Sequence, residues 1–258
     1  MNTAVSADGT TLAYDDLGSG EPIVLVSGAS CARGVHAHAA GLLSSGLRVL
    51  NYDRRGRGDS TDTAPFAVER EIEDLAAMID AAGGSAAVFG SSSGAVLALR
   101  AAIAGLPVTR LVLWEPPFEP AADAPARQAA YVAELTAALD RGDRGAAQEA
   151  FMRRVGLPEQ MIAGARRSPM WKELEEIAHT LPYDAAAMGD CSVPAGAAGL
   201  ATPVLVAYGT ASGDWARNAA DALTAAAPAA RSTALDGQHH DVDFTVLAPV
   251  IEDFARNP

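Results

Sequence analysis

The feature of this sequence that most constrains its fold is an alternation of short apolar runs with longer segments of helical period. Runs such as 23–26 and 86–89 are apolar and bounded by turn residues, as buried strands are. The segment 68–82 places its apolar side chains on one helical face and ends before Gly83, a residue typical of helix C-termini. Strands that alternate with helices in this way predict an α/β fold, in which helices cover a mostly parallel sheet.

Eight segments are expected as strands and four as helices. The expected strands are residues 3–6, 11–16, 23–26, 47–52, 86–89, 109–114, 203–208 and 231–235, and the expected helices are 68–82, 94–104, 215–227 and 243–255. The first two strands are joined by a short turn at Gly9 and form an antiparallel lead-in. After Pro117 the alternation stops, and only alanine-rich helical stretches broken by prolines follow, up to about Ala201. We therefore predict a core of residues 1–116 and 202–258, with an all-helical cap, residues 117–201, inserted after the sixth strand.

The excess of acidic residues argues against some classes of binding partner. Of 258 residues, 32 are acidic and 19 are basic, which makes the formal net charge −13 at pH 7. Such a surface repels phosphate backbones and anionic lipids, so we expect neither nucleic acid nor a membrane as a partner. The N-terminus lacks the basic-then-apolar pattern of a signal peptide, and no apolar run is long enough to span a bilayer. A cytoplasmic location is expected, and the oligomeric state is left open.

A serine-centred turn follows the fifth expected strand. Residues 90–94 read Gly-Ser-Ser-Ser-Gly, which matches G-x-S-x-G with Ser92 at its centre. A serine presented at a sharp strand-to-helix turn has a strained backbone, and side chains beside it would collide with the neighbouring strand and helix. Gly90 and Gly94 would remove those collisions. The pentapeptide alone could equally be an ordinary Gly/Ser-rich turn, so its context decides.

That context resembles the α/β-hydrolase superfamily. Residues 27–28 read Ser-Gly after the third expected strand, where the family usually has His-Gly, and residues 53–60 match its D-x-R-G-x-G-x-S loop. Residues 90–94 match its nucleophile turn, and residues 237–240 match its terminal G-x-x-H. The resemblance covers the whole core in the right order. It implies the α/β-hydrolase fold, with an eight-stranded, mostly parallel sheet flanked by helices, a helical cap over the active site, and Ser92 as the nucleophile.

A serine hydroxyl needs a base within hydrogen-bond reach and a carboxylate that orients the base. The family position of the base is that of His240, and His239 is the less favoured alternative. The usual place of the acid, after the seventh strand, reads Gly-Thr-Ala-Ser, so two substitutes stay open: Glu115, directly after the sixth strand, and Asp214. We favour Glu115, because an acidic residue between an apolar strand and two prolines is hard to explain as surface decoration.

The resemblance also implies residues around the reacting carbonyl. The oxyanion donors of the family map to the backbone N–H groups of Ala29 and Ser93. Ser27 replaces the histidine whose side chain usually braces the loop after the third strand, which puts the geometry of this loop in question. The residues expected to contact substrate are Ser27, Ser30, Cys31, Trp114 and Met188.

No metal or cofactor is expected. His36 and His38 could suggest a metal pair, but no third ligand lies at a helpful spacing, so we interpret them as polar residues of a helix or loop. Cys31 and Cys191 are far apart in the sequence and belong to no C-x-x-C pair, so we expect buried free thiols.

The resemblance implies a cofactor-independent serine hydrolase that acts on an ester, lactone or thioester of a largely apolar small molecule. Three alternatives stay open. One is a carbon–carbon bond hydrolase, which would also use serine. Another is a non-hydrolytic relative, such as a lyase, cyclase or cofactor-free oxygenase, with His240 as a general base. The last is a catalytically silent binding protein.

Overall fold

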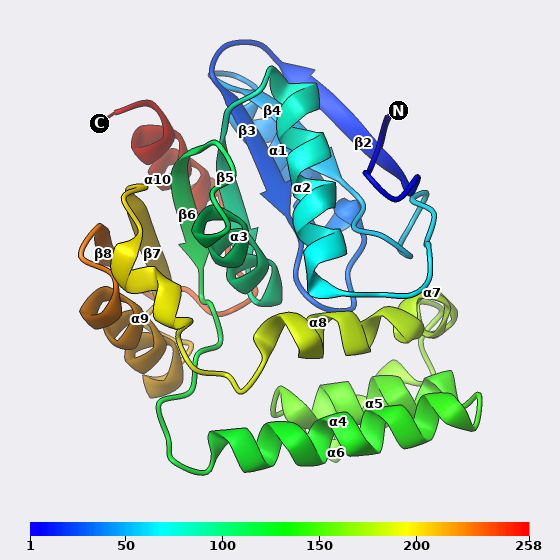
Figure 1. The fold of residues 1–258 in the computed structure, drawn as a ribbon. Coiled ribbons are helices and arrows are strands. Elements are labelled where there is room, and N and C mark those ends of the chain that lie inside the picture. Colours follow the sequence, from blue (N-terminus) through cyan, green and yellow to red (C-terminus); the bar gives the residue numbers. More distant parts are fainter. Residues whose placement is uncertain (258) are drawn as a thin grey trace.

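An eight-stranded sheet forms the centre of the computed structural model, which describes residues 1–257 (Figure 1). The strands are β1 (Asn2–Val5), β2 (Thr11–Gly18), β3 (Pro22–Val26), β4 (Arg48–Tyr52), β5 (Ala86–Ser91), β6 (Val108–Trp114), β7 (Val204–Gly209) and β8 (Ala230–Leu235). Their order across the sheet is β1-β2-β4-β3-β5-β6-β7-β8. The pairs β1–β2 and β2–β4 are antiparallel and all other pairs are parallel. The predicted mostly parallel sheet with an antiparallel lead-in is confirmed.

Helices cover both faces of the sheet. One face is covered by α2 (Val68–Ala82), α3 (Ser93–Ile103) and α9 (Asp214–Ala226), and the other by α1 (Ala37–Leu43) and α10 (Phe244–Arg256). A short 3₁₀ helix, η1 (Arg33–His36), precedes α1. The α2 segment has the predicted bounds, and Gly83 ends it in a left-handed conformation with φ 119°.

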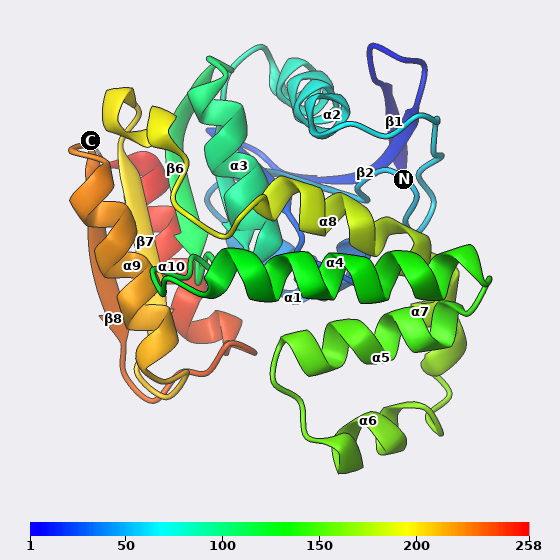
Figure 2. The same cartoon turned by 60° about the horizontal axis from the view of Figure 1, so that its bottom comes forward.

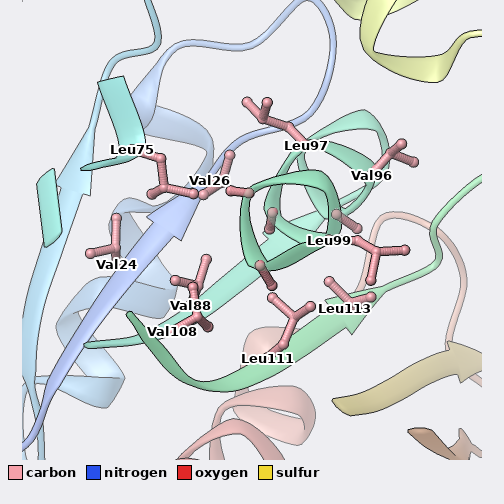
Figure 3. Close-up of a cluster of buried hydrophobic side chains, with 14 of the residues drawn as sticks. Val24, Val26, Leu75, Val88, Val96, Leu97, Leu99, Val108, Leu111 and Leu113 are labelled. Atoms are coloured by element: carbon pink, nitrogen blue, oxygen red, sulfur yellow. The ribbon is translucent and has the colours of Figure 1, made fainter. Parts of the chain in front are cut away.

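Side chains that alternate along each central strand explain this arrangement. In β3, Val24 and Val26 belong to the apolar cluster under α2 and α3, whereas Ile23 and Leu25 belong to the cluster under α1 and α10. Figure 3 shows the first cluster, in which Leu75 of α2 packs against the strand side chains. Strands buried on both faces read as continuous apolar runs, which is the pattern that the sequence shows.

Between β6 and β7 the described residues form helices and connecting loops, with no strand. The helices are α4 (Ala124–Asp140), α5 (Arg144–Arg154), α6 (Glu159–Ala165), α7 (Trp171–Ile177), η2 (Ala178–Thr180), α8 (Leu181–Met188) and η3 (Ala195–Gly199). We call this segment, residues 117–201, the insertion. Figures 1 and 2 show it at the end of the sheet toward which the parallel strands point. The insertion has its own apolar cluster, which includes Leu135 and Leu181. Its treatment as a separate cap domain stays a prediction.

Three local features differ from the sequence-based expectation. The strand β2 continues to Gly18, two residues beyond its expected end, because its last residues pair with Arg48 and Val49 of β4. The strand β5 likewise continues two residues, to Ser91, which pairs with Trp114 of β6. The helix α1 was not predicted, since its seven residues, Ala-His-Ala-Ala-Gly-Leu-Leu, show too little periodicity in the sequence. Within residues 1–257, no helix combines the length and apolar character needed to cross a bilayer.

Candidate active site

Ser92 lies at the turn between β5 and α3 in a conformation that side chains rarely adopt, with φ 55° and ψ −125°. The turn is too tight for side chains on either flank. A Cβ at Gly90 would come within 2.5 Å of the Gly94 carbonyl oxygen, and a Cβ at Gly94 within 2.5 Å of the Ser27 carbonyl oxygen. Both glycines are therefore required, and the strained turn presents Ser92 at the carboxyl edge of the sheet.

A buried carboxylate and a histidine meet at the same edge. Ser91 pairs with Trp114 across β5 and β6, so Ser92 and Glu115 leave the sheet side by side. Glu115 is fully buried, with φ 45°, and its Oε1 accepts a 2.8 Å hydrogen bond from the Gly209 N–H. Its Oε2 lies 2.6 Å from Nδ1 of His240. With the proton on Nδ1 donated to Glu115, Nε2 of the imidazole is left to act as a base.

The other candidates for acid and base lie elsewhere. Asp214 begins α9, its side chain is 81% exposed, and it pairs with Arg217. His239 is exposed. The structure thus brings Glu115, and not Asp214, into contact with His240.

Two tryptophans hold or border the His240 loop. The indole N–H of Trp114 donates a 3.0 Å hydrogen bond to the backbone oxygen of His240, and Trp114 is only 1% exposed. It therefore presents almost no surface for the expected substrate contact. Trp215, which the sequence analysis did not single out, is 41% exposed and packs against the imidazole of His240, with ring centroids 5.6 Å apart. It follows Asp214 directly, in the segment where the family acid is missing.

The loop after β3, residues 27–31, lies against the serine turn; we call it the oxyanion loop. A Cβ at Gly28 would lie 3.1 Å from the Cβ of Ser92, so Ala29 follows a residue in contact with the candidate nucleophile. Within residues 1–257, the backbone N–H groups of Ala29 and Ser93 donate no hydrogen bond to another protein group. These two N–H groups, one in the oxyanion loop and one directly after Ser92, therefore keep the free hydrogen that the predicted oxyanion hole needs.

The remaining candidate residues are only partly available to a substrate. Ser30 adopts φ 56°, and its hydroxyl donates a 2.9 Å hydrogen bond to Oε1 of Gln148, a fully buried residue of the insertion. Cys31 is a free cysteine, and burial raises the pKa of its thiol. Met188 is 8% exposed and packs in the core cluster with α3.

A cluster of buried ion pairs lies behind the oxyanion loop and was not foreseen. Arg54 binds Glu71 of α2 at 2.7 and 2.8 Å and Asp184 of α8 at 2.6 Å. Arg57 donates to the other oxygen of Asp184 at 2.7 Å, and the hydroxyl of Ser93 donates to Asp184 at 2.8 Å. Burial alone would raise the pKa of Asp184, but Arg54 and Arg57 outweigh it and lower that pKa. The sequence offers one signal for this cluster. The D-x-R-G-x-G-x-S motif of residues 53–60 requires only Arg55, so Arg54 and Arg57 are additional.

Of the two histidines that could suggest a metal pair, His38 is exposed. His36 is buried, and its Nε2 lies 3.0 Å from the hydroxyl of Ser91, between the rings of Phe89 and Phe244. Burial lowers its pKa to about 4. The described part of the chain holds no group of three or more His, Cys, Asp or Glu side chains placed to bind a metal.

A pocket of about 340 Å³ lies apart from the candidate active site, where the insertion begins. Phe118 and Cys191 are among the residues that line it.

Comparison with known proteins assigns most of the chain to one family. The model of a family described as "Alpha/beta hydrolase family" matches residues 23–250. The crystal structure of an alpha/beta hydrolase from Sphaerobacter thermophilus is 46% identical, with 98% of this chain and 99% of that chain covered and a TM-score of 0.87. An enol-lactonase from Burkholderia xenovorans is 22% identical, with 99% and 100% covered and a TM-score of 0.70. A thermophilic esterase from Thermogutta terrifontis is 20% identical, with 99% and 97% covered and a TM-score of 0.72. The last two show a shared fold alone.

A shorter match joins the chain to curated proteins. Two proteins from Mycobacterium tuberculosis strains, named as candidate non-heme bromoperoxidases, are 37% identical over 90 residues. The match spans 34% of this chain and 34% of those relatives.

Proposed function

Because this chain belongs to the alpha/beta hydrolase family, we propose that it is a serine hydrolase that cleaves an ester, lactone or thioester with Ser92 as the nucleophile. The observation that carries the proposal is the meeting of three features at one sheet edge. Ser92 has a strained backbone at the strand end, and beside it buried Glu115 holds Nδ1 of His240 at 2.6 Å. A nucleophile, a base and an orienting acid are the parts that acyl transfer needs.

Each residue has one role in the proposed reaction. Nε2 of His240 takes the proton of Ser92 as the serine oxygen attacks the substrate carbonyl, and Glu115 stabilises the imidazolium that forms. The N–H groups of Ala29 and Ser93 bind the developing oxyanion. His240 then protonates the leaving group, which departs, and water activated by His240 releases the acyl group from Ser92. This mechanism requires no cofactor.

The proposed substrate is a small, largely apolar molecule. The half-exposed ring of Trp215 supports this, since it forms an apolar surface in contact with His240. The similarity to folds of proteins named as an esterase and an enol-lactonase is compatible with acyl transfer.

Intact-mass labelling with a fluorophosphonate tests the proposal directly. Wild-type protein is expected to gain one adduct, whereas Ser92→Ala is expected to gain none, because the nucleophile is missing. His240→Gln is expected to react slower by at least about a hundredfold, because the serine loses its base. A folded wild-type protein that gains no adduct would exclude an activated Ser92.

A second candidate is a non-hydrolytic relative in which the His240 and Glu115 pair acts as a base, such as a cofactor-free oxygenase. Ser27 favours it, because this residue replaces the family histidine and its hydroxyl lies a long 3.5 Å from the Cys31 carbonyl oxygen. Ester turnover that disappears in Ser92→Ala would decide for hydrolysis. Oxygen consumption with an acidic carbon substrate that survives in Ser92→Ala and disappears in His240→Gln would decide for the second candidate.

A further inference from the structure

The oxyanion loop holds its shape without the usual side-chain brace. Ser27 occupies the brace position, and its hydroxyl makes only the 3.5 Å contact with the Cys31 carbonyl. Yet Ser30 in this loop has a strained φ of 56°, so other groups must fix the backbone.

Two buried arginines, Arg54 and Arg57, donate hydrogen bonds to backbone carbonyl oxygens of the oxyanion loop. Nη1 of Arg54 donates to the Ser27 carbonyl at 3.1 Å, and Nη1 of Arg57 donates to the Gly28 carbonyl at 2.6 Å. Arg57 also reaches the Cys31 carbonyl at 3.3 Å. Hydrogen bonds from a charged donor are short and strong. These contacts therefore fix the Ser27–Gly28 peptide group and the Gly28–Ala29 peptide group, and the second of these carries the Ala29 N–H.

Both arginines also donate to one carboxylate of the insertion, that of Asp184. The two oxygens of Asp184 accept from Arg54 and from Arg57, and the oxygen shared with Arg54 also accepts from the Ser93 hydroxyl. The side chains of both arginines are 0% exposed and that of Asp184 is 6% exposed. The two proposed oxyanion donors, in the loop and at the start of α3, are therefore tied to the same side chain.

We propose that Asp184 is a positioning residue, which sets the geometry of the oxyanion hole from the insertion by fixing Arg54, Arg57 and Ser93. The inference rests on the proposed serine-hydrolase function. The cluster has two cations, Arg54 and Arg57, and two anions, Glu71 and Asp184. Without the charge of Asp184 one buried guanidinium loses its partner, and the arginines must turn toward other acceptors and release the loop carbonyls.

The test compares two buried carboxylates that each bind arginine. Asp184→Asn removes the charge beside the oxyanion loop. The control, Asp74→Asn, removes a carboxylate that is 1% exposed and binds Arg55 with two 2.7 Å hydrogen bonds in the core. Both variants lose a buried ion pair, so both are expected to lose thermal stability, which calorimetry would measure.

The kinetic readout separates positioning from stability. With a chromogenic ester and active-site titration, Asp184→Asn is expected to lower kcat about 10- to 100-fold, with KM within about threefold of wild type. The rate of fluorophosphonate labelling should fall by a similar factor, because that reaction also develops charge on an oxygen in the hole. Asp74→Asn should keep kcat within about twofold.

A milder variant keeps the charges. Ser93→Ala removes only the hydroxyl that binds Asp184 and retains the backbone N–H, so kcat is expected to fall about 3- to 10-fold. If Asp184→Asn does not fold, an unchanged kcat in Ser93→Ala overturns the inference. A folded Asp184→Asn with wild-type kcat, or an equal loss in Asp74→Asn, overturns it as well. A wild-type protein that is not labelled at all would instead contradict the proposed function.

Discussion

At the scale of single residues, the position of the proposed acid, Glu115, distinguishes this site from the pattern of its family. Glu115 is fixed from two sides, since one oxygen accepts from the Gly209 N–H and the other faces His240. Asp214, near the usual family position, is exposed and engaged with Arg217. An acid that orients a base must be both close and fixed, and only Glu115 is.

We therefore predict a large kinetic difference between two conservative substitutions. Glu115→Gln should lower kcat by about 10³-fold or more, because a neutral amide cannot stabilise the imidazolium and can stabilise the wrong tautomer of His240. Asp214→Asn should change kcat by less than about threefold. Steady-state kinetics with the same ester would measure both, and circular dichroism would verify folding. A larger loss in Asp214→Asn would contradict the assignment of the acid.

Some residues of the candidate site could be predicted from the sequence, and others are identified only by the structure. Ser92 and His240 lie in motifs, and Glu115 stands out because an acid interrupts an apolar stretch. Asp184 has no such signal, because its arginine partners are about 130 positions away at motif positions open to any residue. Trp215 was missed for a similar reason, since its contact with His240 arises only when α9 packs beside β8.

At the scale of elements, the hydrophobic pattern of the sequence located the strands and helices that form the apolar core. The central strands are apolar on both faces and α2 has one apolar face, so all of them could be located from the sequence. The helix α1 could not, because its seven residues show little periodicity and it is stabilised by packing on α10 rather than by its own pattern.

Two glycines in helices offer a matched test of the tight turn. Gly94→Ala in α3 should lower the free energy of unfolding by about 3 kcal/mol or more, because its Cβ would meet the backbone oxygens of Val26 and Ser27 at 2.5 Å. Gly41→Ala in α1 should instead raise it by about 0.5–1 kcal/mol, since no atom lies within 4 Å of the added carbon. Urea denaturation would measure both values. Equal effects would show that the turn is looser than the structure indicates.

At the scale of the whole molecule, stability should depend on pH through a buried histidine that has no part in the proposed reaction. His36 lies between the sheet and α10, and burial lowers its pKa to about 4, compared with 6.5 in an exposed histidine. Between these two values the unfolded chain binds a proton that the folded protein does not. The free energy of unfolding therefore falls as the pH falls through this range, by about 1.4 kcal/mol per unit.

The prediction is a difference between two proteins. From pH 7.5 to pH 5, His36 should cost the wild type about 2 kcal/mol of stability. In His36→Gln, whose amide can still bond to the Ser91 hydroxyl, this loss should disappear. Urea denaturation at both pH values would measure it, and subtraction removes the effect of the net charge that both proteins share. Identical losses in the two proteins would mean that His36 titrates normally in the fold.

The ion pairs of Asp184 also limit how this architecture can be recombined. A designer who replaces the insertion with helices from another family member, in order to change the substrate range, also removes the counter-charge of Arg54 and Arg57. The transplanted helices must bring a carboxylate to the same point, or both arginines must be replaced together with them. In a lineage of such proteins, the insertion and the loop after β4 are therefore expected to change as a linked pair, and chimeras that exchange one without the other should fail.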